Sequence, residues 1–130
     1  MSRLLEDEKA IHDLLAAYCY CVDRGDVEAL VDLFTEDCVW DGGPWGSVEG
    51  RQALREFRSS SAASDAIKTR HLSSSEVISI TGDTAAACSY VLVMNVAQSP
   101  PAPLVVGCYD DQFARVGKRW LFKSRRLRSD

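Results

Sequence analysis

Apolar residues recur every three or four positions near the start of the chain, which is the spacing of one helix face. This stripe consists of Ile11, Leu14, Leu15, Tyr18 and Val22. Gly25 ends the predicted helix, and Asp26 can cap a second one. The inner face of the second helix is formed by Ala29, Leu30, Leu33 and Phe34. The pattern therefore predicts two helices joined as a tight helical hairpin.

A third helix and a series of strands are predicted further along. Residues 38–40 are typical of a short strand, and residues 51–58 of a short helix. The small, polar residues 59–65 predict a mobile connection. Segments rich in Val, Ile, Tyr, Phe and Trp then predict strands near 69–80, 84–95, 104–116 and 120–128. Gly82 and Gly117 each begin a hairpin turn between neighbouring strands.

Helices followed by an antiparallel meander indicate the α+β class. The chain has 130 residues and contains no linker or internal repeat, so we expect one domain spanning residues 1–130. The three helices should cover one face of a strongly curved, mostly antiparallel sheet. A sheet of this kind has a concave interior, which is a natural place for a small-molecule site.

The net charge of the chain argues against two classes of binding partner. The formal net charge is -4, and a mildly acidic chain is a poor fit to nucleic acid or to an anionic membrane. No apolar run approaches the ~20 residues of a membrane-spanning helix, and the charged first ten residues hold no signal-peptide core. We interpret the C-terminal basic cluster as a solvated edge strand; it comprises Lys118, Arg119, Lys123, Arg125, Arg126 and Arg128.

The five cysteines favour a reducing compartment. Their number is odd, no C-x-x-C pair occurs, and their neighbours are apolar. Free buried thiols behave as small hydrophobic side chains. We therefore expect five free thiols, no disulfide, and a cytoplasmic protein.

Short motifs in a fixed order give the chain its resemblance to a known family. They are Ile11-x-x-Leu14, Val22-Asp23-Arg24-Gly25-Asp26, Leu33-Phe34-Thr35-Glu36-Asp37, Gly50-Arg51, Arg70-His71, Gly82-Asp83-Thr84-Ala85, Gly107-x-Tyr109-x-Asp111 and Gly117-Lys118-Arg119-Trp120. In this order and spacing they resemble the SnoaL-like family of the nuclear-transport-factor-two-like superfamily, over nearly the whole chain. The resemblance implies a cone-shaped α+β barrel. That fold hosts dehydratases, isomerases, cyclases, epoxide hydrolases and non-catalytic subunits.

Within the superfamily the chain looks most like the branch of scytalone dehydratase and hexachlorocyclohexane dehydrochlorinase. Those enzymes carry an Asp at the end of the first helix and a His on the first long strand. The matching positions are Asp23 and His71, and the resemblance implies that they meet inside the cone. A neutral imidazole is a good general base near pH 7, and a carboxylate on its other nitrogen orients it. The alternatives are a satisfied structural pair, or Asp23 as a solvated helix-end residue.

Other side chains are candidates for the pocket. Tyr18 lies on the apolar stripe and can polarise a substrate oxygen, or be a core aromatic. Ser73 shares a strand face with His71, and Arg125 can hold an anionic group, although strand parity does not separate it from Arg126. Four aromatic residues have two interpretations, because they can form walls of the pocket or simply pack in the core. They are Trp40, Trp45, Tyr90 and Tyr109.

These observations define two hypotheses of different class. The first is a cofactor-independent lyase or isomerase that acts on a small apolar or aromatic molecule; the second is a binding or scaffold subunit of the same fold. With only two histidines a three-His metal site is impossible, and nothing in the sequence requires a cofactor. We also expect a homodimer or homotrimer, because the outer face of the curved sheet must carry the apolar strand residues that one cavity cannot hold: Val91, Val93, Leu104, Val106 and Trp120.

Overall fold

The computed structural model of the chain describes residues 2–61 and 67–130. Its elements are α1 (Ser2–Arg24), α2 (Val27–Val31), β1 (Phe34–Asp41), a 3-10 turn η1 (Gly43–Trp45), β2 (Ser47–Glu49), α3 (Arg51–Ser61), β3 (Thr69–Thr81), β4 (Thr84–Asn95), β5 (Ala102–Val116) and β6 (Arg119–Ser129). The last four strands form the expected meander, and its two hairpins turn at Gly82 and Gly117, both with positive φ.

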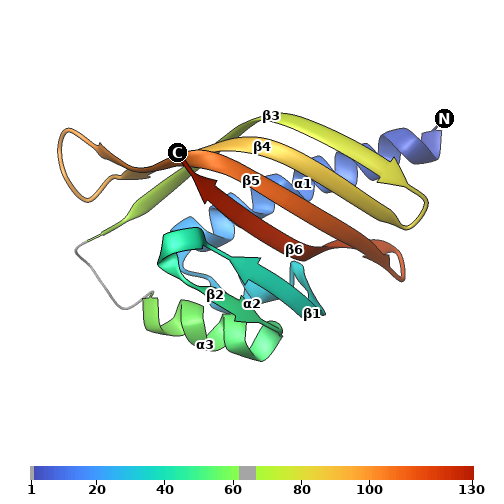
Figure 1. Cartoon of the computed structure of the whole chain (residues 1–130), viewed down its shortest axis with the longest axis horizontal. Helices are drawn as coiled ribbons and strands as arrows, with labels where there is room; N and C mark the ends of the chain where they lie inside the picture. Colours follow the sequence, from blue (N-terminus) through green and yellow to red (C-terminus); the bar gives the residue numbers. More distant parts are fainter. Residues whose placement is uncertain (1, 62–66) are drawn as a thin grey trace.

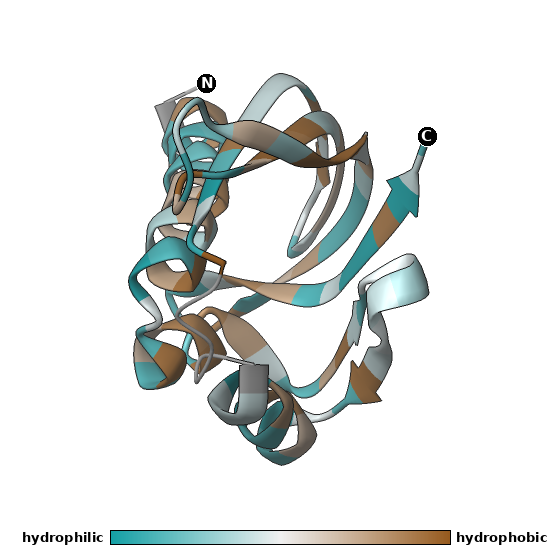
Figure 2. Cartoon of the chain, turned by 90° about the vertical axis from the view of Figure 1, so that its left-hand side faces the viewer, coloured by the Kyte–Doolittle hydropathy of each residue, from teal (hydrophilic) through white to brown (hydrophobic). Residues whose placement is uncertain are grey.

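The six strands form one mixed, mostly antiparallel sheet in the order β2-β1-β6-β5-β4-β3 (Figure 1). Only β1 and β6 pair in parallel. The sheet curls around the helices, so that its concave face is covered by α1 and its lower end by α2 and α3 (Figure 2). The predicted α+β class and the helices on a strongly curved sheet are confirmed.

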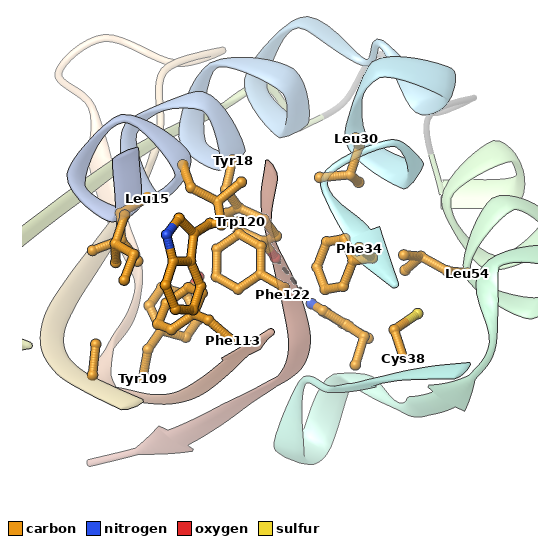
Figure 3. Close-up of a cluster of buried hydrophobic side chains, with 14 of the residues drawn as sticks. Leu15, Tyr18, Leu30, Phe34, Cys38, Leu54, Tyr109, Phe113, Trp120 and Phe122 are labelled. Carbon is orange, nitrogen blue, oxygen red and sulfur yellow. Dashed lines mark hydrogen bonds between the residues drawn. The ribbon is translucent and has the colours of Figure 1, made fainter. Parts of the chain in front are cut away.

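Helix α1 is held to the sheet by its apolar stripe. Ile11, Leu14, Leu15 and Tyr18 are all buried, and they meet the inward side chains of β4, β5 and β6. Tyr18 lies edge-on to Phe34, Tyr109 and Phe122, with ring centroids about 6 Å apart. Figure 3 shows this aromatic cluster at the centre of the core, below α1. The packing fixes the position of the last turn of α1, which carries Asp23.

The N-terminal half of α1 has a polar anchor. Arg115 of β5 makes a bidentate pair with Asp7, at 2.8 and 2.9 Å, and the Trp120 indole donates to the same carboxylate. These donors, with the Arg115 hydrogen bond the largest influence, lower the pKa of Asp7 to about 2. The anchor ties the free end of α1 to the far end of β5 and β6.

We expect Asp7→Asn to lower the melting temperature, and to do so in a pH-dependent way. Because the pKa of Asp7 is depressed in the folded state, its stabilisation is complete above the unfolded value near 3.8 and is lost as the pH falls towards 2. Melting curves of wild type and variant should therefore differ at neutral pH and converge as the pH falls below 4. Asp13→Asn, at an exposed pair with Lys9, is the control. A constant difference across the pH range would contradict this role for Asp7.

The first helical hairpin is shorter than predicted. Helix α2 ends at Val31, and Phe34 opens strand β1 instead of closing a helix. Phe34 pairs with Phe122 of β6, and the two rings stack at 5.0 Å. Packing against the sheet therefore outweighs the helical spacing of Leu33 and Phe34. Strand β2 was not predicted, and α3 continues beyond the predicted end at residue 58 to Ser61. Residues 62–65 of the predicted connection lie outside the described residues.

Two expectations about the sheet surface are wrong. Strand β6 is not an edge strand, because it lies between β1 and β5. Val91, Val93 and Trp120 do not crowd the outer face; they are buried in the core. The convex face carries a different and smaller apolar row, made of Leu72, Tyr90, Leu92 and Val106.

Candidate active site

Asp23 and His71 meet where the end of α1 crosses the start of β3. The His71 Nδ1 atom lies 2.6 Å from Asp23 Oδ1, and the His71 backbone N–H donates to Oδ2 at 2.9 Å. The Thr69 hydroxyl also donates to Oδ1 at 2.9 Å. Only 9% of the His71 side chain and 13% of the Asp23 side chain are exposed. Asp23 is therefore a buried, fully engaged partner of His71 and not a solvated helix-end residue.

The ionisation of Asp23 determines which ring nitrogen of His71 carries the proton. Burial would raise the pKa of Asp23, but the hydrogen bonds from the His71 ring and backbone and from Thr69 outweigh it and lower the pKa. An ionised carboxylate can only accept hydrogen bonds, so Nδ1 of a neutral His71 carries the ring proton. The lone pair is then on Nε2, to which no described residue hydrogen bonds. Nε2 is the ring nitrogen left to face the cavity.

Tyr18 lies next to this pair with both of its acceptor positions occupied. Its hydroxyl oxygen accepts from the Trp40 indole at 2.9 Å and from Arg58 at 3.0 Å. Arg58 also stacks over the Trp40 ring, 4.4 Å from its centroid. A phenol with two donors on its oxygen has only its own O–H left to offer. The Tyr18 ring is 6.3 Å from the His71 ring, edge to face, so a small molecule can contact both.

Arg125 is a core residue. Its side chain has no exposed surface, and it pairs with the equally buried Asp111 through bonds of 3.0 and 3.3 Å. The guanidinium lies 3.5 Å over the centroid of the Tyr109 ring and 4.2 Å over that of Tyr18. Burial raises the pKa of Asp111 to about 6, against the lowering effect of Arg125. The carboxyl is therefore ionised and paired at pH 7.

The dyad opens onto a cavity of about 1430 Å³ between α1, α3 and the concave face of the sheet. Of the residues predicted for the pocket, the cavity is lined by Asp23, His71, Tyr18, Trp40, Trp45, Ser73 and Tyr109. Two predicted contacts are absent from this lining. Tyr90 is 62% exposed on the convex face, so its assignment as a pocket wall is wrong. Arg125 lies behind Tyr18 and Tyr109, committed to Asp111, so its assignment to an anionic substrate group is also wrong.

Sequence reasoning missed several polar residues of the cavity. Among them, Arg58 reaches it from α3, and Glu76 and Thr69 from β3. Arg58 carries a weak signal, because it follows the apolar Leu54 by one turn on the same helix. Glu76 carries none, since its inward direction depends on an irregularity of the strand. Within residues 2–61 and 67–130, His, Cys, Asp and Glu side chains form no group of three that could hold a metal ion.

All five cysteines are free, as the sequence predicted. Cys19 and Cys21 of α1 both line the cavity with the dyad. Burial raises the pKa of each thiol, and a protonated thiol is a weak nucleophile. No helix in the described part of the chain is long and apolar enough to cross a membrane.

Comparison with known proteins agrees with this architecture. The SnoaL-like domain matches residues 3–126, and the chain therefore belongs to the SnoaL-like family. Rv3472 of Mycobacterium tuberculosis, a protein of unknown function, has 28% identity over 99% of this chain and 75% of its own, with a TM-score of 0.90. None of the curated proteins compared with the chain matches it.

Two solved structures from Novosphingobium aromaticivorans are also similar. One, named "putative scytalone dehydratase", has 27% identity over 100% of this chain and 89% of its own, with a TM-score of 0.85. The other is named as the beta subunit of a "putative aromatic-ring-hydroxylating dioxygenase"; it has 23% identity over 98% of this chain and 91% of its own, with a TM-score of 0.85. At that identity the second likeness concerns the fold alone.

Proposed function

We propose that this protein is a cofactor-independent lyase or isomerase that removes a proton from a carbon atom of a small, largely apolar molecule. The observation that carries the proposal is the 2.6 Å contact between Asp23 and His71 Nδ1 at the wall of a large cavity, with Nε2 left without a hydrogen-bond partner among the described residues. A purely structural pair needs no cavity and has no reason to leave a basic nitrogen facing one.

The three polar residues have separate roles in this proposal. His71 Nε2 takes the proton from the C–H bond, and Asp23 stabilises the imidazolium that forms. The C–H electron pair moves into a new double bond. The Tyr18 O–H donates to the oxygen on which negative charge develops. If that oxygen is a leaving group on the next carbon, its C–O bond breaks and the imidazolium returns its proton to the departing oxygen, so the reaction is an elimination. If it is a carbonyl oxygen, the imidazolium returns the proton to another carbon of the enolate, so the reaction is an isomerisation.

A non-catalytic binding or scaffold subunit is the second candidate. It is favoured by the likeness of fold to the dioxygenase beta subunit and by the hydrogen bonds that already satisfy Asp23 from Thr69 and His71. The two candidates differ in one observable, which is whether the protein accelerates the exchange of a carbon-bound proton.

Deuterium exchange tests this difference without knowledge of the leaving group. Small cyclic ketones such as 1-tetralone and 2-tetralone are incubated with the protein in D₂O, and NMR follows the loss of the signal of the C–H next to the carbonyl. We expect exchange faster than in buffer for at least one ketone, and its loss in His71→Ala. Asp13→Ala, at an exposed position of α1 outside the cavity lining, is the control. Equal exchange by wild type and His71→Ala would favour the subunit function.

The partners and compartment proposed from the sequence complete this picture. Five free thiols suit a reducing cytoplasm. The outer apolar row of Leu72, Tyr90, Leu92 and Val106 joins cross-strand neighbours on β3, β4 and β5. Contiguous exposed apolar residues of this kind commonly mark an interface, so we propose a homodimer or homotrimer that meets at this face.

Light scattering should give a multiple of the 14.3 kDa chain mass at micromolar concentration. Leu92→Arg places a charge at the centre of the row and should yield monomers. Val116→Arg, at an exposed valine of the remote β5–β6 hairpin, should not. A wild-type mass of 14.3 kDa would contradict the proposed interface.

A further inference from the structure

Strand β3 contains an extra residue halfway along its length. The register of β3 against β4 shifts between Ser74 and Val77, so that Ser75 and Glu76 together oppose Ser89. Ser75 has a φ of 59°, in the left-handed region that residues other than glycine rarely adopt. Such bulges re-aim side chains and are over-represented beside active sites.

The bulge turns the Glu76 side chain inward and the Val77 side chain outward. Regular alternation from His71 would send Val77 inward and Glu76 outward. Instead Val77 is 70% exposed, while Glu76 is half-buried and lines the cavity. No described residue hydrogen bonds to the Glu76 carboxylate or pairs with its charge. This arrangement is the reverse of the one that burial energy favours, so Glu76 needs another reason to face inward.

Two serine hydroxyls accompany Glu76 on the concave face. The Oγ atoms of Ser73 and Ser89 are buried, and neither has a hydrogen-bond partner. Ser89 is 3% exposed and lies directly opposite the bulge. Buried polar groups are normally satisfied, so two unsatisfied buried hydroxyls beside the half-buried Glu76 carboxylate indicate a missing polar partner.

We infer that the cavity takes a substrate with a hydrogen-bond donor, such as a hydroxyl group, at the end remote from its reacting carbon, and that Glu76, with Ser73, receives that donor. His71 and Glu76 point from the same strand face, roughly 13 Å apart along β3 between their Cα atoms. A two-ring molecule fits between their side chains. The inference rests on the proposed function, which places the reacting carbon of the substrate at His71. It adds the chemical class of the group at the opposite end of the substrate.

The chemistry of a carboxylate sets the selectivity of this polar end. A carboxylate only accepts hydrogen bonds, so it favours O–H or N–H groups over bare rings. It also repels an anion placed beside it. The cationic side chains of the lining come from the end of α1, from α3 and from the residues at the start of β3, and they are Arg24, Arg58, Lys68 and Arg70. The buried Arg125 is committed to Asp111. A neutral hydroxylated ring system should therefore bind better than either the plain ring or its carboxylate.

Binding of naphthalene, 2-naphthol and 2-naphthoate to the whole protein tests the inference, by calorimetry or fluorescence titration. We expect 2-naphthol to bind about tenfold more tightly than naphthalene, because it gains a hydrogen bond to a charged acceptor. Glu76→Ala should abolish that preference, and Glu76→Gln should raise the affinity for 2-naphthoate relative to 2-naphthol. Glu56→Gln, on the exposed side of α3, and Ser74→Ala, on the outer face of β3, are the matched controls.

Ser73→Ala gives a second, nearly isosteric variant at the cavity wall that should weaken 2-naphthol binding and leave naphthalene binding unchanged. Equal affinities of the wild type for the two compounds, including no binding of either, would overturn the inference. A preference that persists in both Glu76→Ala and Ser73→Ala would also overturn it. His71→Ala should keep the preference, because it changes the other end of the cavity. If the wild type does not accelerate ketone exchange, the result counts against the catalytic role of Asp23 and His71 alone. If the wild type shows no preference for 2-naphthol, the result counts against the binding role of Glu76 alone.

Discussion

Arg125→Ala is expected to destabilise the fold by about 3–5 kcal/mol, because it empties a fully buried site and removes one partner of a buried ion pair. The Arg125 guanidinium fills the space between the rings of Tyr18, Tyr109 and Phe122 and pairs with Asp111. Truncation leaves a cavity, forfeits the cation–π contacts, and leaves the Asp111 carboxylate without a counter-ion. Such a loss is a large part of the 5–15 kcal/mol that stabilises an ordinary domain.

The neighbouring arginine provides the matched control. Arg126 points outward, half of its side chain is exposed, and it pairs with the partly exposed Asp41 at 3.3 Å. Exposed pairs contribute about 0–1 kcal/mol, so Arg126→Ala should unfold at nearly the wild-type urea concentration. If the two variants unfolded at the same urea concentration, Arg125 would not be the core residue described here.

The same pair predicts how the Arg125→Ala penalty changes with pH. The pKa of Asp111 is raised to about 6 by burial even with Arg125 present, and loss of the guanidinium should raise it further. A carboxyl with a raised folded-state pKa favours the folded state at low pH and loses that contribution as the pH rises. The destabilisation by Arg125→Ala should therefore be smaller at pH 5 than at pH 7.

Most of the fold follows from local patterns that the tertiary structure does not override. Alternation places the four long strands within about two residues of their observed ends, because each strand has one apolar face to bury. The same alternation on β4 buries Ser89, Val91 and Val93. It could also have shown that Tyr90 points away from the pocket.

Strand irregularities explain the assignments that the sequence could not make. On β6 the register against β5 shifts, so that Gln112 pairs with Ser124 while Phe113 pairs with Phe122. The extra residue, Lys123, turns Arg125 inward, where counting by twos from Phe122 would have chosen a different residue. The bulge at Ser75 has the same effect on Glu76. Bulges depend on partner strands, so no pattern within one strand predicts them.

The dyad itself came from the family resemblance and not from local chemistry. Nothing in the residues around Asp23 or His71 marks them as partners, since they are 48 positions apart. Their contact requires α1 to lie along β3 in one register, which the aromatic packing of Tyr18 fixes. Sequence motifs that specify this packing therefore carry the geometry of the site indirectly.

Asp23→Asn is expected to lower the rate of carbon-proton exchange by about 10²–10⁴-fold, once a reactive ketone has been identified. The amide cannot stabilise the imidazolium that forms on His71, and it can offer an N–H to Nδ1. That contact would move the ring proton to Nε2, which is the nitrogen that must accept the proton from carbon. The fold should persist, because the side chains are nearly the same size.

Two measurements separate this catalytic role from a structural one. Nitrogen-15 NMR of the imidazole should show the Nδ1–H tautomer of His71 in the wild type and a loss of that tautomer in Asp23→Asn, while the resonances of His12 stay unchanged. Asp13→Asn is the matched control for the rate, because this exposed carboxylate lies on the same helix and outside the cavity lining. If Asp23→Asn exchanged the ketone within a few-fold of the wild-type rate while its tautomer had changed, proton abstraction by His71 Nε2 would be excluded.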